Sequence, residues 1–239
     1  LSWFKIGYRD RIATASFDLF NFLVRRDIYG GLVDDNPDPA IVAAYFSDPS
    51  FANTLGVTPA EIGAIVEGRT LNLSKSKVEG IDFDLRYRHP LGDAGHMWVS
   101  LGGTRLLTID NQITDAAPAI NVVGTLGNPV KLRLRGQAGV TIGALDASLG
   151  LQHVAGYHNL TVTPAQQVKS WTTFDLQFGT RIAQLGSDRS LRLALTINNL
   201  FDKAPPYVEF RTPTSAFGYD PEQANAIGRL IALQTMVSW

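Results

Sequence analysis

The C-terminal residues 227–239 alternate between apolar positions and polar or small positions. The apolar parity carries Ile227, Ile231, Leu233, Val237 and Trp239, with Arg229 and Thr235 as its polar members. A period of two residues predicts a β-strand with one apolar face. The strand ends on an aromatic residue, which is typical of a strand that is anchored at a lipid–water boundary. The alternative interpretation of this segment is the last strand of a soluble β-sandwich.

The same alternation recurs along the chain and predicts about eight antiparallel strands. We expect them over residues 1–12, around 81–87, and over 96–109, 131–142, 149–157, 174–181, 191–198 and 227–239. No apolar run approaches the roughly 18 residues that a membrane-spanning helix requires. If this chain crosses a membrane, we therefore expect it to cross with strands.

The predicted connections alternate between short and long. Short turns rich in Gly and Asp are expected at 92–93, 143–146 and 186–188, and longer links at 13–69, 111–128, 159–169 and 202–226. Short turns on one side and long loops on the other are typical of a transmembrane barrel. In the first long link, Asp38-Pro39 before 40–46 and Thr58-Pro59 before 61–66 predict two short helices, because each pairs a capping residue with a proline at the first helical position.

Charged side chains occupy the polar parity of several strands. We expect one shared polar face that carries Lys131, Arg133, Arg135, Gln137, Asp175 and Arg192, together with Asp82 and Asp84. Unpaired charges are costly both in a packed core and in lipid. The pattern therefore predicts a broad, wet interior, in which these side chains pair with one another or with a segment that fills the interior.

The seventh strand and its exit loop carry a family resemblance. Residues 195–206 read Leu-Thr-Ile-Asn-Asn-Leu-Phe-Asp-Lys-Ala-Pro-Pro, and Tyr219-Asp220-Pro221 and Gly228-Arg229 follow before the aromatic end. These motifs resemble the closing strands of TonB-dependent outer-membrane receptors; residues 78–82 and, more loosely, 3–12 resemble earlier strands of that family. The resemblance implies that barrel closure involves Asn198, Asn199, Phe201, Asp202, Pro205, Pro206, Arg229 and Trp239. We expect Arg229 to hold a loop carboxylate such as Asp220.

The resemblance implies an all-β, antiparallel transmembrane β-barrel portion that supplies about eight C-terminal strands of a 22-stranded barrel. Residues 1–239 would form this C-terminal segment, with the link 13–69 on the extracellular side and with the plug domain and TonB box outside the segment. It further implies a Gram-negative bacterial outer membrane and import of a scarce ligand, most often a ferric siderophore. The implied partners are the TonB complex, acting through the plug, a small-molecule ligand such as a metal chelate, and the membrane lipid, with no cofactor.

Two other membrane roles stay open at this point. The chain could form a complete eight-stranded barrel with a structural or adhesive role, because eight strands can close around a side-chain-filled interior, or it could be a passive porin. For the ligand, aromatic residues in the first long link are candidate contacts, with packing of the link's own helices as the alternative. These residues are Tyr29, Tyr45, Phe46 and Phe51.

Composition narrows the remaining function classes. The net charge of −1 implies no attraction to nucleic acid. The chain has no cysteine, which excludes disulfides and thiolate metal sites. Its four histidines, His89, His96, His153 and His158, lack an evident third ligand or nucleophile, and no catalytic motif is present. We therefore expect no enzymatic activity.

Overall fold

The computed structural model describes residues 1–14, 23, 26–114, 117–184, 190–210 and 218–238. The chain forms two compact units. The sheet unit comprises Leu1–Lys5, Val78–Ile109 and Val122–Trp239, and the loop unit comprises Ile6–Lys77 and Asp110–Asn121. Strands β1 (Ser2–Thr14), β4 (Thr70–Pro90) and β5 (Gly95–Gln112) contribute residues to both units.

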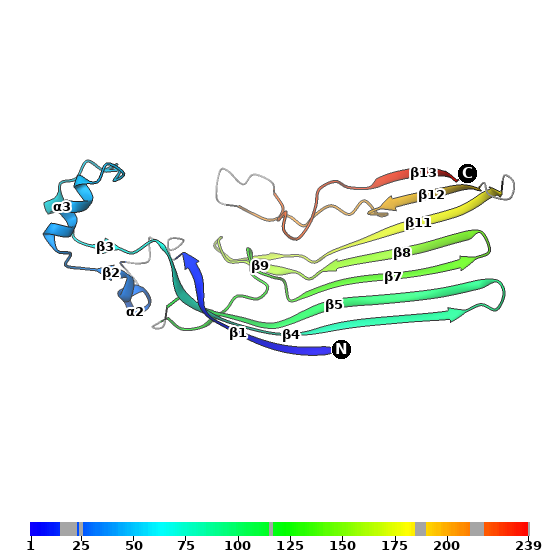
Figure 1. Cartoon of the computed structure of the whole chain (residues 1–239), viewed down its shortest axis with the longest axis horizontal. Coiled ribbons are helices and arrows are strands. Elements are labelled where there is room, and N and C mark those ends of the chain that lie inside the picture. Colours follow the sequence, from blue (N-terminus) through cyan, green and yellow to red (C-terminus); the bar gives the residue numbers. More distant parts are fainter. Residues whose placement is uncertain (15–22, 24–25, 115–116, 185–189, 211–217, 239) are drawn as a thin grey trace. The chain divides into compact units, whose positions relative to one another are not determined.

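The long strands form one antiparallel meander, which confirms the all-β antiparallel prediction. Its order is β1-β4-β5-β7-β8-β11-β12-β13 (Figure 1). The short strand β6 pairs with β5. The further bounds are β6 Ile120–Asn121, β7 Leu132–Ile142, β8 Leu145–Val154, β11 Trp171–Gln184, β12 Ser190–Asn198 and β13 Leu230–Ser238. Among the described residues β1 and β13 stand at the two ends of this order, so the sheet is open.

Tight turns join neighbouring strands at one end of the sheet. Between β7 and β8 the turn is Gly143-Ala144, where Gly143 has a φ of +57° that favours glycine. Beside it, Gly95 opens β5 with a φ of +146°, and a Cβ there would lie 1.9 Å from the Thr141 carbonyl oxygen. The third predicted turn, 186–188, lies outside the described residues.

The link between β8 and β11 is more ordered than the alternation predicts. The prediction of one strand running to residue 157 is wrong, because β8 ends at Val154 and a separate strand β9 (Tyr157–Asn159) pairs with β10 (Gln166–Val168). Gly156 permits the change of direction, since a Cβ there would lie 2.6 Å from the Val168 carbonyl oxygen. Packing stabilises this arrangement through a buried cluster of Val130, Val154, Tyr157, Val168 and Val208.

The loop unit contains the short elements of the first long link. They are α2 (Arg26–Tyr29), η2 (Gly30–Leu32), β2 (Val33–Asp34), α3 (Pro39–Ser47), η3 (Pro59–Glu61) and β3 (Ile65–Val66). The predicted helix after Asp38 is confirmed, and the Asp38 carboxylate caps it by accepting a bond from the Ala40 N–H at 2.8 Å. Among the described residues, no helix is both long and apolar enough to cross a membrane.

The predicted helix over 61–66 is wrong. The capping box of Thr58 and Glu61 does form, but only a single 3₁₀ turn follows it. Ile65 and Val66 instead pair with Asp34 and Val33 as strand β3. Isoleucine and valine are stiff at χ1 and favour strands, and the glycine at 63 weakens any helix across this segment.

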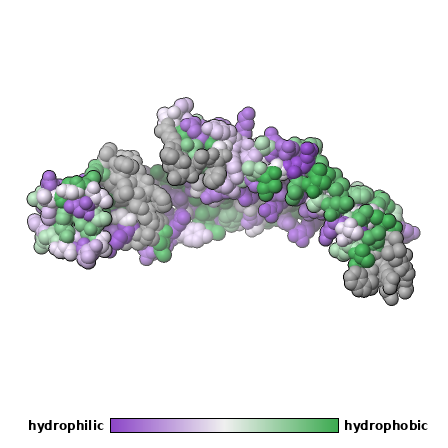
Figure 2. Space-filling view, turned by 90° about the horizontal axis from the view of Figure 1, so that it is seen from above, coloured by the Kyte–Doolittle hydropathy of each residue, from purple (hydrophilic) through white to green (hydrophobic). Residues whose placement is uncertain are grey.

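Alternation gives the sheet unit one apolar and one polar face. On β7 the apolar face carries Leu132, Leu134, Gly136, Ala138, Val140 and Ile142, and the polar face carries Arg133, Arg135, Gln137, Gly139 and Thr141. Large apolar side chains remain exposed; Leu233, for example, is 70% exposed. Figure 2 shows apolar side chains in green gathered over the end of the sheet where β13 terminates. Within the described residues, nothing in this chain covers these side chains.

Candidate functional site

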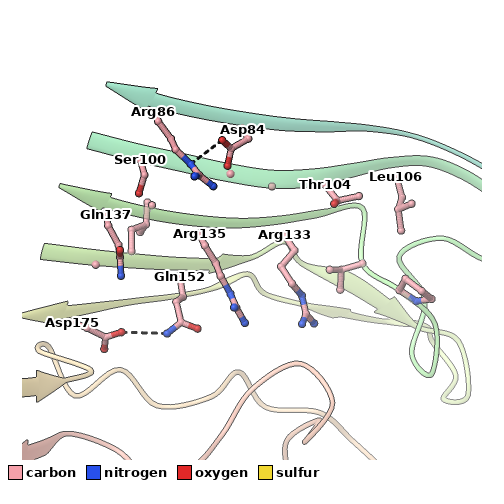
Figure 3. Close-up of a pocket in the computed structure, with 17 residues that line it drawn as sticks. Asp84, Arg86, Ser100, Thr104, Leu106, Arg133, Arg135, Gln137, Gln152 and Asp175 are labelled. Carbon is pink, nitrogen blue, oxygen red and sulfur yellow. Dashed lines mark hydrogen bonds and ion pairs between the residues drawn. The ribbon is translucent and has the colours of Figure 1, made fainter. Parts of the chain in front are cut away.

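The polar face of the sheet unit contains a hollow of about 880 Å³ (Figure 3). Strand register brings its residues into lateral rows. Ser100 pairs with Gln137, Gln137 with Gly150, and Gly150 with Asp175. One step further along the strands, Arg135 lies between Gly102 and Gln152. Because residues that face each other across antiparallel strands share a face, the alternation alone places these side chains together.

The carboxylates of this hollow are already engaged. Asp84 Oδ1 lies 3.1 Å from Arg86 Nε. Asp175 accepts from the Gln152 side-chain amide at 3.2 Å and from the backbone N–H of Asn199 at 2.8 Å. Neither of these acids forms an ion pair with a guanidinium of β7 among the described residues. Asp84 therefore has a charged partner of its own, and Asp175 is held by two uncharged donors.

The two β7 arginines have no acidic partner in the part of the chain that the structure describes. Arg133 donates from Nη2 to Gln223 Oε1 at 2.6 Å, and this acceptor is a neutral amide. The side chain of Arg135 extends beside that of Arg133 into the hollow (Figure 3). Gly102 and Gly150, on the same face, leave space around it. This arrangement can attract and bind an anion.

The other predicted residues of the polar face, Lys131, Asp82 and Arg192, do not line this hollow. Arg192 forms an ion pair with Asp146 at 2.9 Å in a second hollow of about 460 Å³. Asp82 accepts from the Thr104 hydroxyl at 2.5 Å. Lys131 precedes β7 and does not line either hollow; its aliphatic stem lies against Gly124.

The predicted closing motif builds the loop that follows β12. Asn199 has a φ of +51°, its amide donates to the Lys203 carbonyl at 3.1 Å, and its oxygen accepts from the Lys203 N–H at 2.8 Å. Phe201 packs edge-on against Phe174 at a ring-centroid distance of 5.5 Å. Pro205 and Pro206 are half-buried, Asn198 ends β12, and Trp239 lies outside the described residues.

The expected contact between Arg229 and Asp220 is replaced by two others. The backbone N–H of Arg229 donates to Asp202 Oδ1 at 2.8 Å. Asp220 accepts from the Tyr157 hydroxyl at 2.9 Å and from the Glu222 N–H at 3.0 Å. Tyr157 and Asp220 are both buried, so the carboxylate is out of reach of an exposed side chain such as Arg229.

The link between Tyr157 and Asp220 ties two loops together beyond the long strands. Burial raises the pKa of the Tyr157 hydroxyl above its ordinary value, and the hydrogen bond to Asp220 raises this pKa further. The hydroxyl therefore stays protonated and remains a donor at neutral pH. Asn159 reinforces the same region, since its buried amide donates to the Glu209 carbonyl at 2.7 Å.

The four aromatic residues proposed as ligand contacts belong to the loop unit. Tyr29 is 2% exposed and packs with Leu32 and Ala117, so it serves as a core residue there. Phe46 and Phe51 contact each other at a centroid distance of 4.9 Å. Tyr45 is exposed. Ligand contact by Tyr45, Phe46 and Phe51 stays a prediction.

The histidines do not gather into a site. His153 bonds with the Thr172 hydroxyl at 2.8 Å, and the ring of His89 stacks on Tyr87. Within the described residues, no three His, Asp or Glu side chains lie close enough to hold a metal ion.

Sequence reasoning missed two polar residues that line the hollow, Arg86 and Gln152, and one residue that reaches Arg133 from outside the hollow, Gln223. Arg86 and Gln152 share the polar parity of β4 and β8, so the strand alternation could have identified them. Gln223 reaches Arg133 from a loop 90 residues away, and no sequence signal marks it.

No protein-family model, curated protein or solved structure matches this chain.

Proposed function

We propose that this chain forms part of the barrel wall of an active transporter in the outer membrane of Gram-negative bacteria. The transporter binds a scarce extracellular ligand of the ferric-siderophore class and imports it with energy from the TonB complex. One observation carries the proposal: an antiparallel meander presents an exposed apolar face on one side and a charged, hollowed face on the other. A soluble domain rarely exposes so extended an apolar surface.

The dimensions of the apolar face support a membrane location. On β7 every second residue from Leu132 to Ile142 is apolar or glycine. These ten residue steps span on the order of 33 Å along the strand. At a tilt of roughly 35–45°, this length covers about 25 Å across the membrane, the height of the apolar band in outer-membrane barrels.

The polar end of this face supports the same interpretation. Arg105 on β5 pairs in register with Leu132 on β7. On the next two strands, β8 and β11, His153 and Thr172 form a hydrogen bond with each other. Nearby, Glu79 accepts from the Trp3 indole at 3.2 Å and lies 3.6 Å from the Lys5 ammonium. Charged groups and an exposed tryptophan at the margin of an apolar band suit a lipid–water boundary.

The direction of transport rests on the resemblance of residues 195–206 and 219–229 to TonB-dependent receptors. In this proposal the long links, including 13–69, are extracellular, and the polar face lines the interior. Shortening the link 13–69 in the full-length receptor should weaken ligand binding while the barrel stays folded, because a lid supplies contacts and excludes water.

Cysteine labelling tests the orientation of the two faces. Leu193→Cys and Arg192→Cys are neighbours on β12 with opposite parity. In outer membranes that carry the full-length protein, a lipid-soluble thiol reagent should label position 193 and a membrane-impermeant reagent position 192. Equal labelling of both positions by the impermeant reagent would refute a lipid-facing side.

Uptake measurements test the energy source. Import of the ligand should vanish in a strain that lacks TonB, whereas binding at the cell surface should persist. Import that continues without TonB would favour a passive porin. Correct labelling of both faces with no import in either strain would favour a structural or adhesive barrel.

A further inference from the structure

We infer that Arg133 and Arg135 form a binding site for a small polyanion, a molecule that carries at least two carboxylate or phosphate groups. The inference rests on the proposed function, because it names the chemical class of ligand that the polar face accepts. The sequence alone predicts only that these charges line the interior and pair with one another or with a segment that fills it. The inference adds that the two arginines bind a ligand.

Three arginines and two aspartates line the hollow, so one positive charge is in excess there, which favours an anion. Asp84 pairs with Arg86, and Asp175 is held by Gln152 and Asn199. Within the described residues, the guanidiniums of Arg133 and Arg135 have no carboxylate partner. Two adjacent positive charges repel each other, and a ligand with two negative groups removes this repulsion while it forms charge-assisted hydrogen bonds.

The spacing of the two arginines selects a ligand with more than one anionic group. They are two residues apart on the same face of β7, so their Cα atoms lie roughly 6.6 Å apart. Each guanidinium can bind one carboxylate or phosphate through two parallel N–H donors. A hollow of about 880 Å³ is large enough for a small molecule that spans both groups.

Neutral donors complete the site around the arginines. Gln137 lies two residues beyond Arg135 on the same face, and the Ser100 hydroxyl lies opposite Gln137 in the strand register. Gln223 Oε1 now accepts from Arg133, and an anionic oxygen is a stronger acceptor than an amide oxygen. Ligand binding should therefore release Gln223, so the loop from Pro221 to Asn225 should respond to the ligand.

Calorimetric titration of the full-length protein in detergent tests the inference with two probes. Citrate supplies three carboxylates, inorganic tripolyphosphate supplies phosphate groups, and triethyl citrate is the uncharged control. We expect citrate, tripolyphosphate or both to bind, with affinity that falls as salt is raised, and triethyl citrate not to bind. Preference for one probe would identify the anionic group of the natural ligand.

Matched variants locate the binding. Arg135→Gln and Arg133→Gln should each raise the dissociation constant on the order of tenfold, because each removes a charge-assisted pair and keeps a polar side chain. Arg105→Gln is the control: Arg105 lies at the same level of the sheet on the opposite face, so its loss should leave the dissociation constant unchanged. Circular dichroism would verify that all three variants fold.

Two results would overturn the inference. One is binding that Arg135→Gln and Arg105→Gln weaken equally, which would indicate a nonspecific effect of charge. The other is absence of binding by both probes while an Arg135→Cys variant resists an aqueous thiol reagent, which would show that another segment of the protein covers the arginines. Either result, obtained with a protein that still imports its ligand in a TonB-dependent manner, leaves the proposed function intact.

Discussion

Replacing Tyr157 with phenylalanine removes a single hydroxyl from the contact between two loops. In the native protein that hydroxyl donates to Asp220 at 2.9 Å, and both residues are buried. The variant keeps the aromatic ring and its packing against the buried valines, but leaves the carboxylate of Asp220 with one donor fewer. Hydrogen bonds to charged groups contribute about 1.5–3 kcal/mol, so we expect the free energy of local opening to fall by about that amount.

Hydrogen exchange detected by mass spectrometry measures this change. Amides of β9 and β10 and of residues 218–224 should exchange roughly tenfold to a hundredfold faster in Tyr157→Phe than in the native protein. Tyr207→Phe is the matched control, because Tyr207 is 67% exposed and lies in the neighbouring loop. Equal exchange in Tyr157→Phe and the native protein, or equal acceleration by both variants, would refute the reasoning.

The pH dependence of the same loops provides a second readout. The pKa of the Tyr157 hydroxyl is raised in the folded protein, mainly by burial and then by the bond to Asp220. The native protein therefore holds its proton more tightly than the unfolded chain does. The stability linked to this group is fully present below about pH 10, the ordinary pKa of tyrosine, and declines as pH rises above it. Tyr157→Phe should lack that contribution to the alkaline decline.

Two further predictions concern other parts of the chain. Gly228→Ala should lower the free energy of unfolding by about 1–2 kcal/mol in denaturant titrations, because Gly228 has a φ of +74° and a Cβ there would lie 3.0 Å from Asp202 Oδ1. Gly127→Ala is the control: Gly127 has a similar φ of +76° but open space around it, so this variant measures the cost of backbone strain without the contact to Asp202. Arg69→Gln should raise the pKa of the Glu67 carboxyl from about 2 to its ordinary range, because hydrogen bonds from Arg69 depress this pKa. In the native protein, the stability linked to Glu67 is present above the ordinary pKa and is lost as pH falls towards 2. An NMR titration of Glu67 whose midpoint is the same in the variant and the native protein would contradict this cause.

Strand alternation predicted the long sheet because burial and strand geometry act locally. Each face of β7 or β12 can be identified from every second residue, and the antiparallel order follows when consecutive strands are joined by short connections. The charged face with Arg133, Arg135 and Asp175 could be predicted for the same reason, because the odd or even position of a residue along a strand assigns its side chain to one face.

Contacts between loops were beyond sequence reasoning. Tyr157 and Asp220 are 63 residues apart, and neither position carries a periodic signal. The prediction that Arg229 holds Asp220 is therefore wrong: the contact is made by the backbone N–H of Arg229, and the carboxylate that accepts it belongs to Asp202. The helix predicted after Thr58 also failed, because the pairing of β3 with β2 outweighs a favourable capping box.

The open edges of the sheet bear on the size of the barrel that we propose. In lipid, each unpaired backbone N–H or C=O group costs several kcal/mol, so in the proposed membrane location the edges at β1 and β13 would each need a pairing partner. Closing these eight strands on one another would give an interior just wide enough for side chains to fill it. The polar face instead carries Arg133 and Arg135 without acidic partners among the described residues, beside a hollow of about 880 Å³. Confining these guanidiniums in a narrow interior would require desolvating like charges next to each other, which is strongly unfavourable. The wide barrel that we propose, in which further strands pair with both edges and water or ligand reaches the arginines, would satisfy the unpaired edges and keep both guanidiniums solvated or bound.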